Sequence, residues 1–592
     1  MIPGRKRTES LSSVDVAWYH MEDPTNLMMI TGVFIFDEPV DFERLKATLD
    51  VRFVQRYRRF RQRVVAKRSR FGRSYWEDDP TFDISAHVHR GALPTPGDHA
   101  TLQELVSDLM STQLDLSKPL WQFHLIDGYE GRSVLLMRVH HAVADGIALV
   151  QVMLSMTDSW RDAPLTDGAP PPPRRKGWNP LAPVTRPATA AVKMTQKTVG
   201  AATRTSLAVA RDPEQLVVMA RKGTDVALTT GRLLLMAPDP KTVYKGKLKV
   251  PKKAAWSEPI PLDDVKLIGR AIGGTVNDVL MSAAAGAMRR YLLSRSASVD
   301  DLNFRAIIPV NLRKNLAKFE LGNKFGLVFL SLPIGIEDPV ERLRELKQRM
   351  DDLKDTSEPI VAFGILALIG MMPNRLEDVV VDIFGKKGTL VMTNVPGPRD
   401  PLFLAGAPIG QMMFWVPQSG RLGLGISILS YNNQVMIGVA TDTSLVPDPE
   451  VIVAGFEAEL VALKTEMRQR LMETALKFNI PLAEVESQMK AEVDSAAEDM
   501  GISALDVMAA VEVASINGTG DGALSLDEDD LTVIVGIGPG YAAELRSAGI
   551  VTYADLAAST PDGLAAAIDV PEWRRPDFQV WIDQAKSLRE RA

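Results

Sequence analysis

Cysteine is absent from this 592-residue chain, and its absence excludes several kinds of chemistry. Without cysteine there is no disulfide framework, no thiolate nucleophile, no cysteine-ligated zinc site and no covalent cysteine intermediate. Long apolar runs are also missing, because the longest covers only residues 360–372 and a membrane-spanning helix needs about 20 residues. No apolar segment follows the basic N-terminus, so we see no secretory signal. The sequence therefore predicts a cytoplasmic protein that is soluble or bound at a membrane surface.

Histidine is scarce and occurs only in the N-terminal part of the chain. The seven histidines occupy positions 20, 87, 89, 99, 124, 140 and 141. An acid–base reaction that uses histidine must therefore take it from this part. The bulk composition is ordinary: 46% of the residues are hydrophobic, 24% are charged and the formal net charge is −6, which is typical of a globular protein and names no partner.

Two stretches of the chain alternate apolar strands with amphipathic helices, which predicts an α/β fold with two similar lobes. A proline-rich and helical segment between them suggests a crossover linker. An acidic, helical connector and a small helical unit follow. The predicted divisions are an N-terminal lobe at 1–165, the crossover at 166–245, a C-terminal lobe at 246–465, the connector at 466–530 and the small unit at 531–592.

The strands and helices can be placed from the hydrophobic pattern. The clearest predicted strands are residues 27–36, 134–139, 304–309, 325–332, 389–393, 423–430 and 435–440. The predicted helices are residues 41–52, 147–160, 257–293 in two pieces, 339–355 and 449–467. A pair of histidines lies between the strand at 134–139 and the helix at 147–160. These histidines should lie on a strand-to-helix turn, where side chains can project into a cleft.

The motif His140-His141-x-x-x-Asp145-Gly146 contains the best candidate for an acid–base group. Histidine suits the removal of a hydroxyl proton, because its unperturbed pKa of about 6.5 leaves it neutral near pH 7. Asp145 is a good helix N-cap that can brace the turn, and Gly146 allows close approach of the backbone. Two other interpretations remain open. The histidine pair could be a structural turn, or His141 and Asp145 could bind a metal ion with further ligands.

Further segments, in a fixed order, favour the catalytic interpretation. They are Pro119–Trp121, His140–Gly146, Asn277-Asp278, Pro309–Arg313, Gly322-Asn323 and Asn394–Pro398. With these segments the chain resembles the bacterial wax ester synthase/diacylglycerol acyltransferase family over about residues 10–465. That family belongs to a superfamily of CoA-dependent acyltransferases. The resemblance therefore implies two lobes similar to chloramphenicol acetyltransferase.

The resemblance also implies roles for individual residues. His141 matches the family's general base, and His140 matches a supporting histidine. Asp145 matches a structural aspartate that pairs with an arginine, for which Arg313 and Arg138 are both candidates. Asn277 matches an asparagine that faces the active site from the second lobe, where an amide donor could stabilise a tetrahedral oxyanion. The alternative interpretation of Asn277 is a helix N-cap.

The resemblance implies an enzyme that uses acyl-CoA as co-substrate, needs no cofactor, and esterifies diacylglycerol or a long-chain alcohol. The sequence has no Gly-x-Ser-x-Gly elbow, phosphate-binding loop or dinucleotide fingerprint, which favours direct transfer without an acyl-enzyme. The alternatives are an acyltransferase for another hydroxyl or amine and a non-catalytic scaffold at a lipid surface. Two features depart from the family: Asn311 stands where serine is common, and the chain continues well beyond residue 465.

Residues 51–74 contain many basic side chains, interleaved with aromatic ones, and no acidic one. Such a stretch could attract anionic lipid headgroups or the phosphates of CoA. We therefore predict peripheral association with the inner membrane face or with lipid droplets, where apolar acceptors reside. Nucleic acid is not expected, because no nucleic-acid-binding fold signature accompanies the stretch. A solvated face without a partner is the alternative interpretation.

The C-terminal residues carry two further patterns. Gly536-Ile-Gly-Pro-Gly540 and the helix predicted after it resemble a helix-hairpin-helix unit, and the net negative charge of this unit favours a protein partner over DNA. Asn517, Thr519, Asp521 and Glu528 have the spacing of positions one, three, five and twelve of a calcium-binding EF-hand loop. Aspartate is usual at the first position, so an acidic linker is the alternative interpretation.

Overall fold

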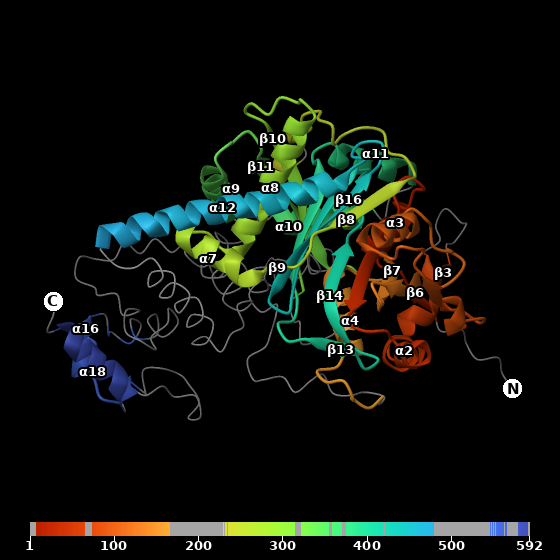
Figure 1. Ribbon diagram of the computed structural model, residues 1–592, viewed down its shortest axis with the longest axis horizontal. Helices are drawn as coiled ribbons and strands as arrows, with labels where there is room; N and C mark the ends of the chain where they lie inside the picture. The colour runs from red at the N-terminus through yellow and green to blue at the C-terminus, as the bar shows by residue number, and fades with distance from the viewer. Residues whose placement is uncertain are drawn as a thin grey trace, which may run out of the picture. The chain divides into compact units, whose positions relative to one another are not determined.

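The computed structural model describes residues 8–65, 74–165, 235–313, 321–354, 358–369, 374–418 and 421–478. It also describes residues 229 and 231–233. Near the C-terminus it describes residues 545, 548, 550, 552–561, 563–564 and 578–589. The chain divides into two compact units, Met1–Ile516 and Asn517–Ala592. The first unit has an α/β fold built on two large sheets, as the sequence predicts (Figure 1).

The first lobe is built on a sheet of six strands within the described residues. Their order across the sheet is β13-β14-β2-β7-β6-β5. The strands are β2 (Met29–Phe36), β5 (Val88–Ala92), β6 (Trp121–Tyr129), β7 (Arg132–His140), β13 (Leu402–Leu404) and β14 (Ala407–Trp415). β7 lies between β2 and β6 and is buried along almost its whole length. This explains its largely apolar sequence, because a strand covered on both faces has no solvent side.

The helices of the first lobe begin at polar side chains that cap their free N–H groups. The helices are α1 (Ser13–His20), α2 (Phe42–Leu49), α3 (His99–Met110) and α4 (Gly146–Met156), and their caps are Ser12, Asp41, Asp98 and Asp145. Short helical turns are η1 (Asp50–Gln55), η2 (Arg58–Arg61) and η3 (Ile84–Ala86). A small separate sheet has the order β1 (Thr8–Ser10), β4 (Tyr75–Asp78) and β3 (Gln62–Val65).

The second lobe is built on the other large sheet. Its order is β11-β10-β12-β15-β16-β8, with β9 pairing to β16. The strands are β8 (Lys252–Trp256), β9 (Ile260–Pro261), β10 (Asn303–Asn311), β11 (Phe325–Pro333), β12 (Leu390–Pro396), β15 (Leu424–Tyr431) and β16 (Gln434–Asp442). The helices are α7 (Leu262–Ile272), α8 (Val276–Ser294), α9 (Pro339–Lys354), α10 (Glu358–Ile369), α11 (Asn374–Gly385) and α12 (Pro449–Phe478).

Small residues on α8 allow the long helix α12 to lie across it (Figure 1). Ala283, Ala284, Ala285 and Ala287 are all fully buried. Short side chains bring two helix backbones close together, so the pair buries apolar surface over a long contact. α8 is therefore the central helix of the second lobe.

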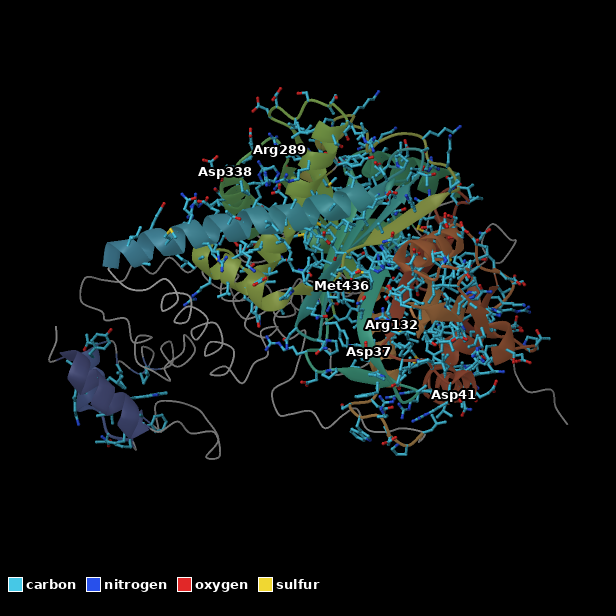
Figure 2. All side chains as sticks on the ribbon, in the orientation of Figure 1. Asp37, Asp41, Arg132, Arg289, Asp338 and Met436 are labelled. Carbon is cyan, nitrogen blue, oxygen red and sulfur yellow. The ribbon has the colours of Figure 1, made fainter. Side chains whose placement is uncertain are left out.

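The two lobes share a strand and a hydrophobic core. β14 belongs by sequence to the second lobe, yet it pairs with β2 of the first sheet, for example Met412 with Phe34. A cluster that includes Val33 and Leu136 of the first sheet also includes Trp256 and Met436 of the second. Figure 2 labels Met436 among the side chains. This pairing could not be predicted from the sequence, because pairing between residues so far apart in the chain leaves no local pattern.

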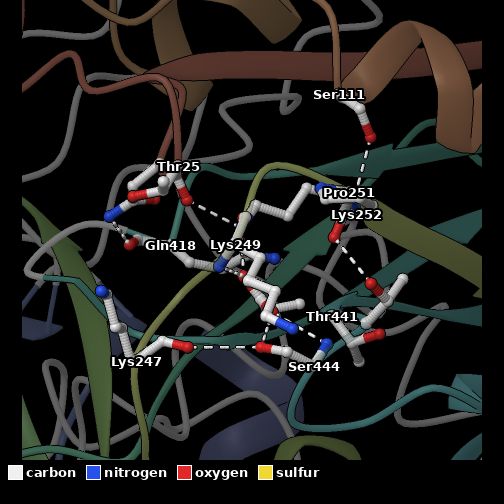
Figure 3. Close-up of polar contacts among 12 residues, drawn as sticks. Thr25, Ser111, Lys247, Lys249, Pro251, Lys252, Gln418, Thr441 and Ser444 are labelled. Atoms are coloured by element: carbon white, nitrogen blue, oxygen red, sulfur yellow. Dashed lines mark hydrogen bonds and ion pairs between the residues drawn. The ribbon is translucent and has the colours of Figure 1, made fainter.

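A buried lysine forms a second joint between the lobes (Figure 3). The Nζ atom of Lys252 donates hydrogen bonds to Asp442 Oδ2 at 2.6 Å, to the carbonyl of Thr25 at 2.7 Å and to that of Lys249 at 2.8 Å. Its backbone N–H donates to Ser111 Oγ at 2.8 Å. Because every proton of the ammonium group has an acceptor, the charge is tolerated in the interior. Thr25 and Ser111 thereby connect the first lobe to β8.

Several element ends differ from the predicted ones. α4 ends at Met156 rather than at residue 160, because the chain turns to an extended conformation at Thr157 and Asp158 then bridges to Phe403. Residues 257–259 precede the short strand β9 instead of beginning a helix. α12 continues to Phe478, beyond the division set at 465. Apolar periodicity cannot fix such ends, since tertiary contacts decide them.

Four of the six described arginines in the basic stretch at 51–74 form ion pairs with acidic side chains from other parts of the chain. The ion pairs within its described residues are Arg52–Asp158, Arg58–Asp78, Arg59–Glu9 and Arg63–Glu77. Arg52 is buried, and the guanidinium of Arg59 also lies over the ring of Trp76. These arginines hold the first lobe together, so they support a lipid-binding surface less than the sequence alone suggested. Residues 66–73 lie outside the described part.

The second unit, Asn517–Ala592, contains α16 (Tyr553–Ala558) and α18 (Phe578–Arg589) among its described residues. Its small core includes Leu545, Leu556, Leu564, Phe578 and Trp581. The glycine-rich segment 536–540, the calcium-loop candidates Asn517, Thr519, Asp521 and Glu528, and the proline-rich segment all lie outside the described residues. None of the described helices combines the length and apolarity required to cross a membrane.

Candidate active site

His140 ends β7 and holds the turn that follows it. The N–H of Ala142 donates to His140 Nδ1 at 3.0 Å, so a neutral His140 carries its proton on Nε2. That Nε2 lies 3.4 Å from a carboxylate oxygen of Glu22, which the sequence analysis did not identify. The side chain of His140 is fully buried. His140 is therefore fixed in one orientation, as a supporting residue would be.

His141 lies on the turn between β7 and α4, as predicted. Its backbone N–H donates to the carbonyl of Met28 at 2.7 Å. The imidazole stacks on the indole ring of Trp18, with ring centroids 4.0 Å apart and an angle of 20° between the planes. Phe325 from the second lobe lies 5.6 Å away. Burial lowers the pKa of His141 to about 4, which keeps the imidazole neutral near pH 7, and its Nδ1 atom is buried.

Asp145 caps α4 and binds the second lobe. Its Oδ1 accepts from the N–H of Ala148 at 3.0 Å, as expected for an N-cap. Its Oδ2 accepts from Arg313 Nη1 at 2.5 Å and from the N–H of Lys324 at 2.9 Å. The partner of Asp145 is thus Arg313. Since both carboxylate oxygens already accept from N–H donors, the metal-ligand interpretation of Asp145 is not favoured.

Arg138, the other candidate partner, lies elsewhere. Its guanidinium donates to the carbonyl of Thr112 and to Gln122 Oε1. Asn311 supports Arg313 instead, because its Oδ1 accepts from the N–H of Arg313 at 3.1 Å. Asn311, which stands where serine is common in the family, therefore still makes a hydrogen bond beside the Arg313–Asp145 ion pair.

Asn323 links His141 to α1, a contact that local sequence patterns do not indicate. Its Nδ2 donates to the carbonyl of His141 and to Asp15 Oδ1, both at 2.8 Å. Burial raises the pKa of Asp15. The preceding Gly322 has a φ of 101°, a conformation that favours glycine. The pair Gly322-Asn323 thus shapes the loop that holds the backbone of His141.

Asn277 is in the first turn of α8 but does not cap it. Thr275 is the N-cap, because its hydroxyl accepts from the N–H of Asp278 and the Asp278 carboxylate accepts from the N–H of Thr275. Instead, Asn277 Oδ1 accepts from Asn394 Nδ2 at 2.9 Å. This contact joins two segments of the family pattern, whereas no contact between the described residues joins Asn277 to His141.

Gly146 opens α4 and lies beside open space. Within the described residues, a Cβ atom at this position would meet no atom within 4 Å outside its immediate neighbours. The close approach of a backbone that glycine would allow here stays a prediction. The glycine leaves open space next to the Asp145 turn.

Comparison with known proteins places these features in a family. A model of the wax ester synthase/diacylglycerol acyltransferase catalytic domain matches residues 11–280, and a model of the C-terminal domain of the same family matches residues 321–464. A Mycobacterium tuberculosis protein named as a probable diacylglycerol O-acyltransferase, tgs2, is 30% identical over 417 residues, which cover 68% of this chain and 87% of the relative. The chain belongs to the wax ester synthase/diacylglycerol acyltransferase family. This acyltransferase carries the complete histidine motif of the predicted resemblance.

Solved structures confirm the fold of this acyltransferase. The wax ester synthase/diacylglycerol acyltransferase of Marinobacter aquaeolei VT8 is 22% identical and aligns with a TM-score of 0.54, over 77% of this chain and 99% of that one. The first condensation domain of the CDA synthetase is 16% identical and aligns with a TM-score of 0.51, over 77% and 96% of the two chains. A helix-hairpin-helix domain model, RS2/RL21/YNQ2, matches residues 531–589, which confirms the predicted resemblance of the small unit.

The low pKa of His141 predicts a loss of stability in acid. Folded His141 resists protonation until about pH 4, whereas the same residue in the unfolded chain binds a proton near pH 6.5. The stability is therefore fully present above pH 6.5 and declines as the pH falls towards 4, by up to about 3 kcal/mol from this residue. Replacing His141 with glutamine should flatten the pH dependence of urea unfolding between pH 6.5 and 4.5. If the free energy of unfolding depended on pH equally in the wild type and in His141→Gln, His141 would not be buried and neutral.

Proposed function

We propose that this acyltransferase moves a long-chain acyl group from acyl-CoA to the hydroxyl of diacylglycerol or of a long-chain alcohol, with His141 as the general base. The observation that carries the proposal is a neutral, buried imidazole on a turn that both lobes hold. A base must be unprotonated before it can accept a proton, and a fixed orientation lowers the cost of reaching the transition state. The names of the relatives supply the two acceptor classes.

The proposed reaction needs no covalent intermediate on the enzyme. Because Nδ1 of His141 is buried, Nε2 is the nitrogen that meets the acceptor hydroxyl. His141 removes the hydroxyl proton while the alcohol oxygen attacks the thioester carbonyl carbon. The tetrahedral intermediate then collapses, the carbon–sulfur bond breaks, and the CoA thiolate takes the proton from His141. The charge of Asp145 favours the imidazolium that forms between these steps.

Asn277 is the proposed donor to the oxyanion. Its Oδ1 already accepts from Asn394, so the amide that remains available on Asn277 is its NH₂ group. An amide donor directed at the developing oxyanion contributes about 3 kcal/mol in comparable hydrolases. In this proposal acyl-CoA is the only co-substrate, and no cofactor takes part.

The acceptors are apolar, so we also propose that the enzyme works at a membrane or lipid-droplet surface. Part of the stretch at 51–74 lies outside the described residues, and the charges there could add to such a contact. The small C-terminal unit is the proposed contact for a protein partner, because its net charge is negative.

The proposed substrates can be tested with the purified full chain. Palmitoyl-CoA is supplied with dioleoylglycerol, with hexadecanol, or with no acceptor, and both free CoA and the ester product are measured. We expect ester formation with at least one acceptor. The amount of ester should equal the amount of CoA that is released in excess of the acceptor-free control. CoA release without any ester would mean thioester hydrolysis, and no reaction with either acceptor would reject the proposed substrates.

A further inference from the structure

Helix α1 places an aromatic ring against the proposed base. Trp18 stacks on His141 as described above, and it also lies 5.9 Å from Phe325, with an angle of 37° between these two rings. Trp18 is only 3% exposed. One face of the imidazole is therefore covered by an indole ring. The residues of this stack come from three separate parts of the chain.

The stack restricts His141 and excludes water from it. A pair of aromatic rings at this distance attracts beyond the burial of area, which disfavours other orientations of the imidazole. Covering one face also removes hydration, and desolvation is the largest cause of the low pKa of His141. The indole face would also attract the protonated ring. Because desolvation is the largest cause of the shift, removal of the indole should raise the pKa of His141.

The contact with His141 distinguishes Trp18 from other buried tryptophans. The Nε1–H of Trp18 is buried and has no hydrogen-bond partner within the described residues, which destabilises the folded state. The same is true of Trp76, Trp256 and Trp415. Among these four tryptophans, only Trp18 stacks on the imidazole of His141 in the described residues.

Polar contacts from both lobes hold α1 in register with His141. Ser12 caps the helix. Asp15 in the first turn accepts two hydrogen bonds from Asn323, from its backbone N–H at 3.2 Å and from its Nδ2 at 2.8 Å. The same Nδ2 donates to the carbonyl of His141. The loop that follows α1 is held by Lys252 at Thr25 (Figure 3). Trp18 thus sits on an element whose position relative to His141 is fixed at both ends.

We propose that Trp18 is a positioning residue of this acyltransferase: its indole ring holds the imidazole of His141 in the orientation that accepts the hydroxyl proton and shields it from water. The inference rests on the proposed role of His141 as base. Trp18 itself touches neither the bond that forms nor the bond that breaks, so it acts on the reaction through His141.

The first test compares turnover in three Trp18 variants. Trp18→Leu removes the aromatic face, and Trp18→Met serves as a second variant that fills more of the space should the leucine variant fail to fold. We expect kcat to fall between about 10-fold and 100-fold in both, with KM changed by less than about threefold, because positioning affects the transition state more than binding. Trp18→Phe restores a ring and should stay within about threefold of the wild type.

A matched control separates this role from general packing. Trp415 is also buried, its Nε1 has no hydrogen-bond partner within the described residues, and its ring lies 5.3 Å from that of Trp256, away from the described contacts of His141. Trp415→Leu removes a comparable ring. It should reduce stability without changing the ratio of kcat at pH 5.5 to kcat at pH 7.5, whereas this ratio should fall several-fold in Trp18→Leu because the pKa of His141 rises.

The second test follows the NMR signal of His141 in the absence of substrate. The protein is labelled with ¹³C at the ε1 carbon of its histidines, and the His141 resonance is identified as the one that disappears in His141→Gln. In the wild type it should stay constant between pH 7.5 and 5.5, and in Trp18→Leu it should lose its ring-current shift and titrate in that range. An unchanged resonance together with unchanged turnover in Trp18→Leu would overturn the proposal. Full turnover in His141→Gln would instead reject the proposed base, so the two failures are distinguishable.

Discussion

Replacing His141 with glutamine is expected to lower kcat by about 10³-fold, the largest effect of any single substitution considered for this enzyme. Glutamine has a similar size and can keep the turn, but it cannot accept a proton from the acceptor hydroxyl. The loss should appear in kcat, with KM for palmitoyl-CoA nearly unchanged, because His141 acts on the proton in transit rather than on the bound substrates. Initial rates at several acyl-CoA concentrations would separate the two parameters.

His99→Gln is the control for the loss of an imidazole. His99 begins α3, contacts Trp256 and Gln103, and makes none of the described contacts to the His141 turn. It should keep kcat within about threefold of the wild type, as expected for a residue outside the site. If His141→Gln retained more than a tenth of the wild-type kcat, a general-base role for His141 would be untenable.

Arg313→Met is expected to destabilise the protein by about 3–5 kcal/mol. Both partners of the Arg313–Asp145 pair are almost fully buried, with side chains 5% and 4% exposed, so the substitution leaves a carboxylate in the interior without its cation. The loop that contains Lys324 and Asn323 would also lose an anchor. Because Asn323 binds the carbonyl of His141, turnover should fall together with stability. Urea unfolding and kcat, measured on the same preparations, test both expectations.

Two comparisons make the Arg313 result specific. Arg90→Met breaks an exposed pair with Asp127, in which the arginine side chain is 57% exposed, and should cost about 0–1 kcal/mol. The double variant Arg313→Met with Asp145→Asn removes both charges and should recover part of the lost stability. If Arg313→Met and Arg90→Met lowered the free energy of unfolding equally, the Arg313–Asp145 pair would not join the lobes as its contacts suggest.

The local chemistry of the site could be read from the sequence because its causes are local. An apolar strand that ends at His140 and an aspartate at the start of a helix determine a strand-to-helix turn, and both features lie within a few residues of each other. The two-lobed α/β class followed in the same way from the alternation of strand and helix patterns. The family resemblance added the roles of single residues, which periodicity does not reveal.

The class of the fold, the position of the histidine turn and the family could all be inferred without the structure. The folded chain was needed to show that Asp145 pairs with Arg313 rather than with Arg138 and that β14 joins the first sheet. It was also needed to show that Arg58 pairs with Asp78 and that Trp18 covers His141. Each of these contacts joins residues that are distant in the chain. Short-range patterns cannot encode them, because burial and pairing across such distances depend on how the whole lobe packs.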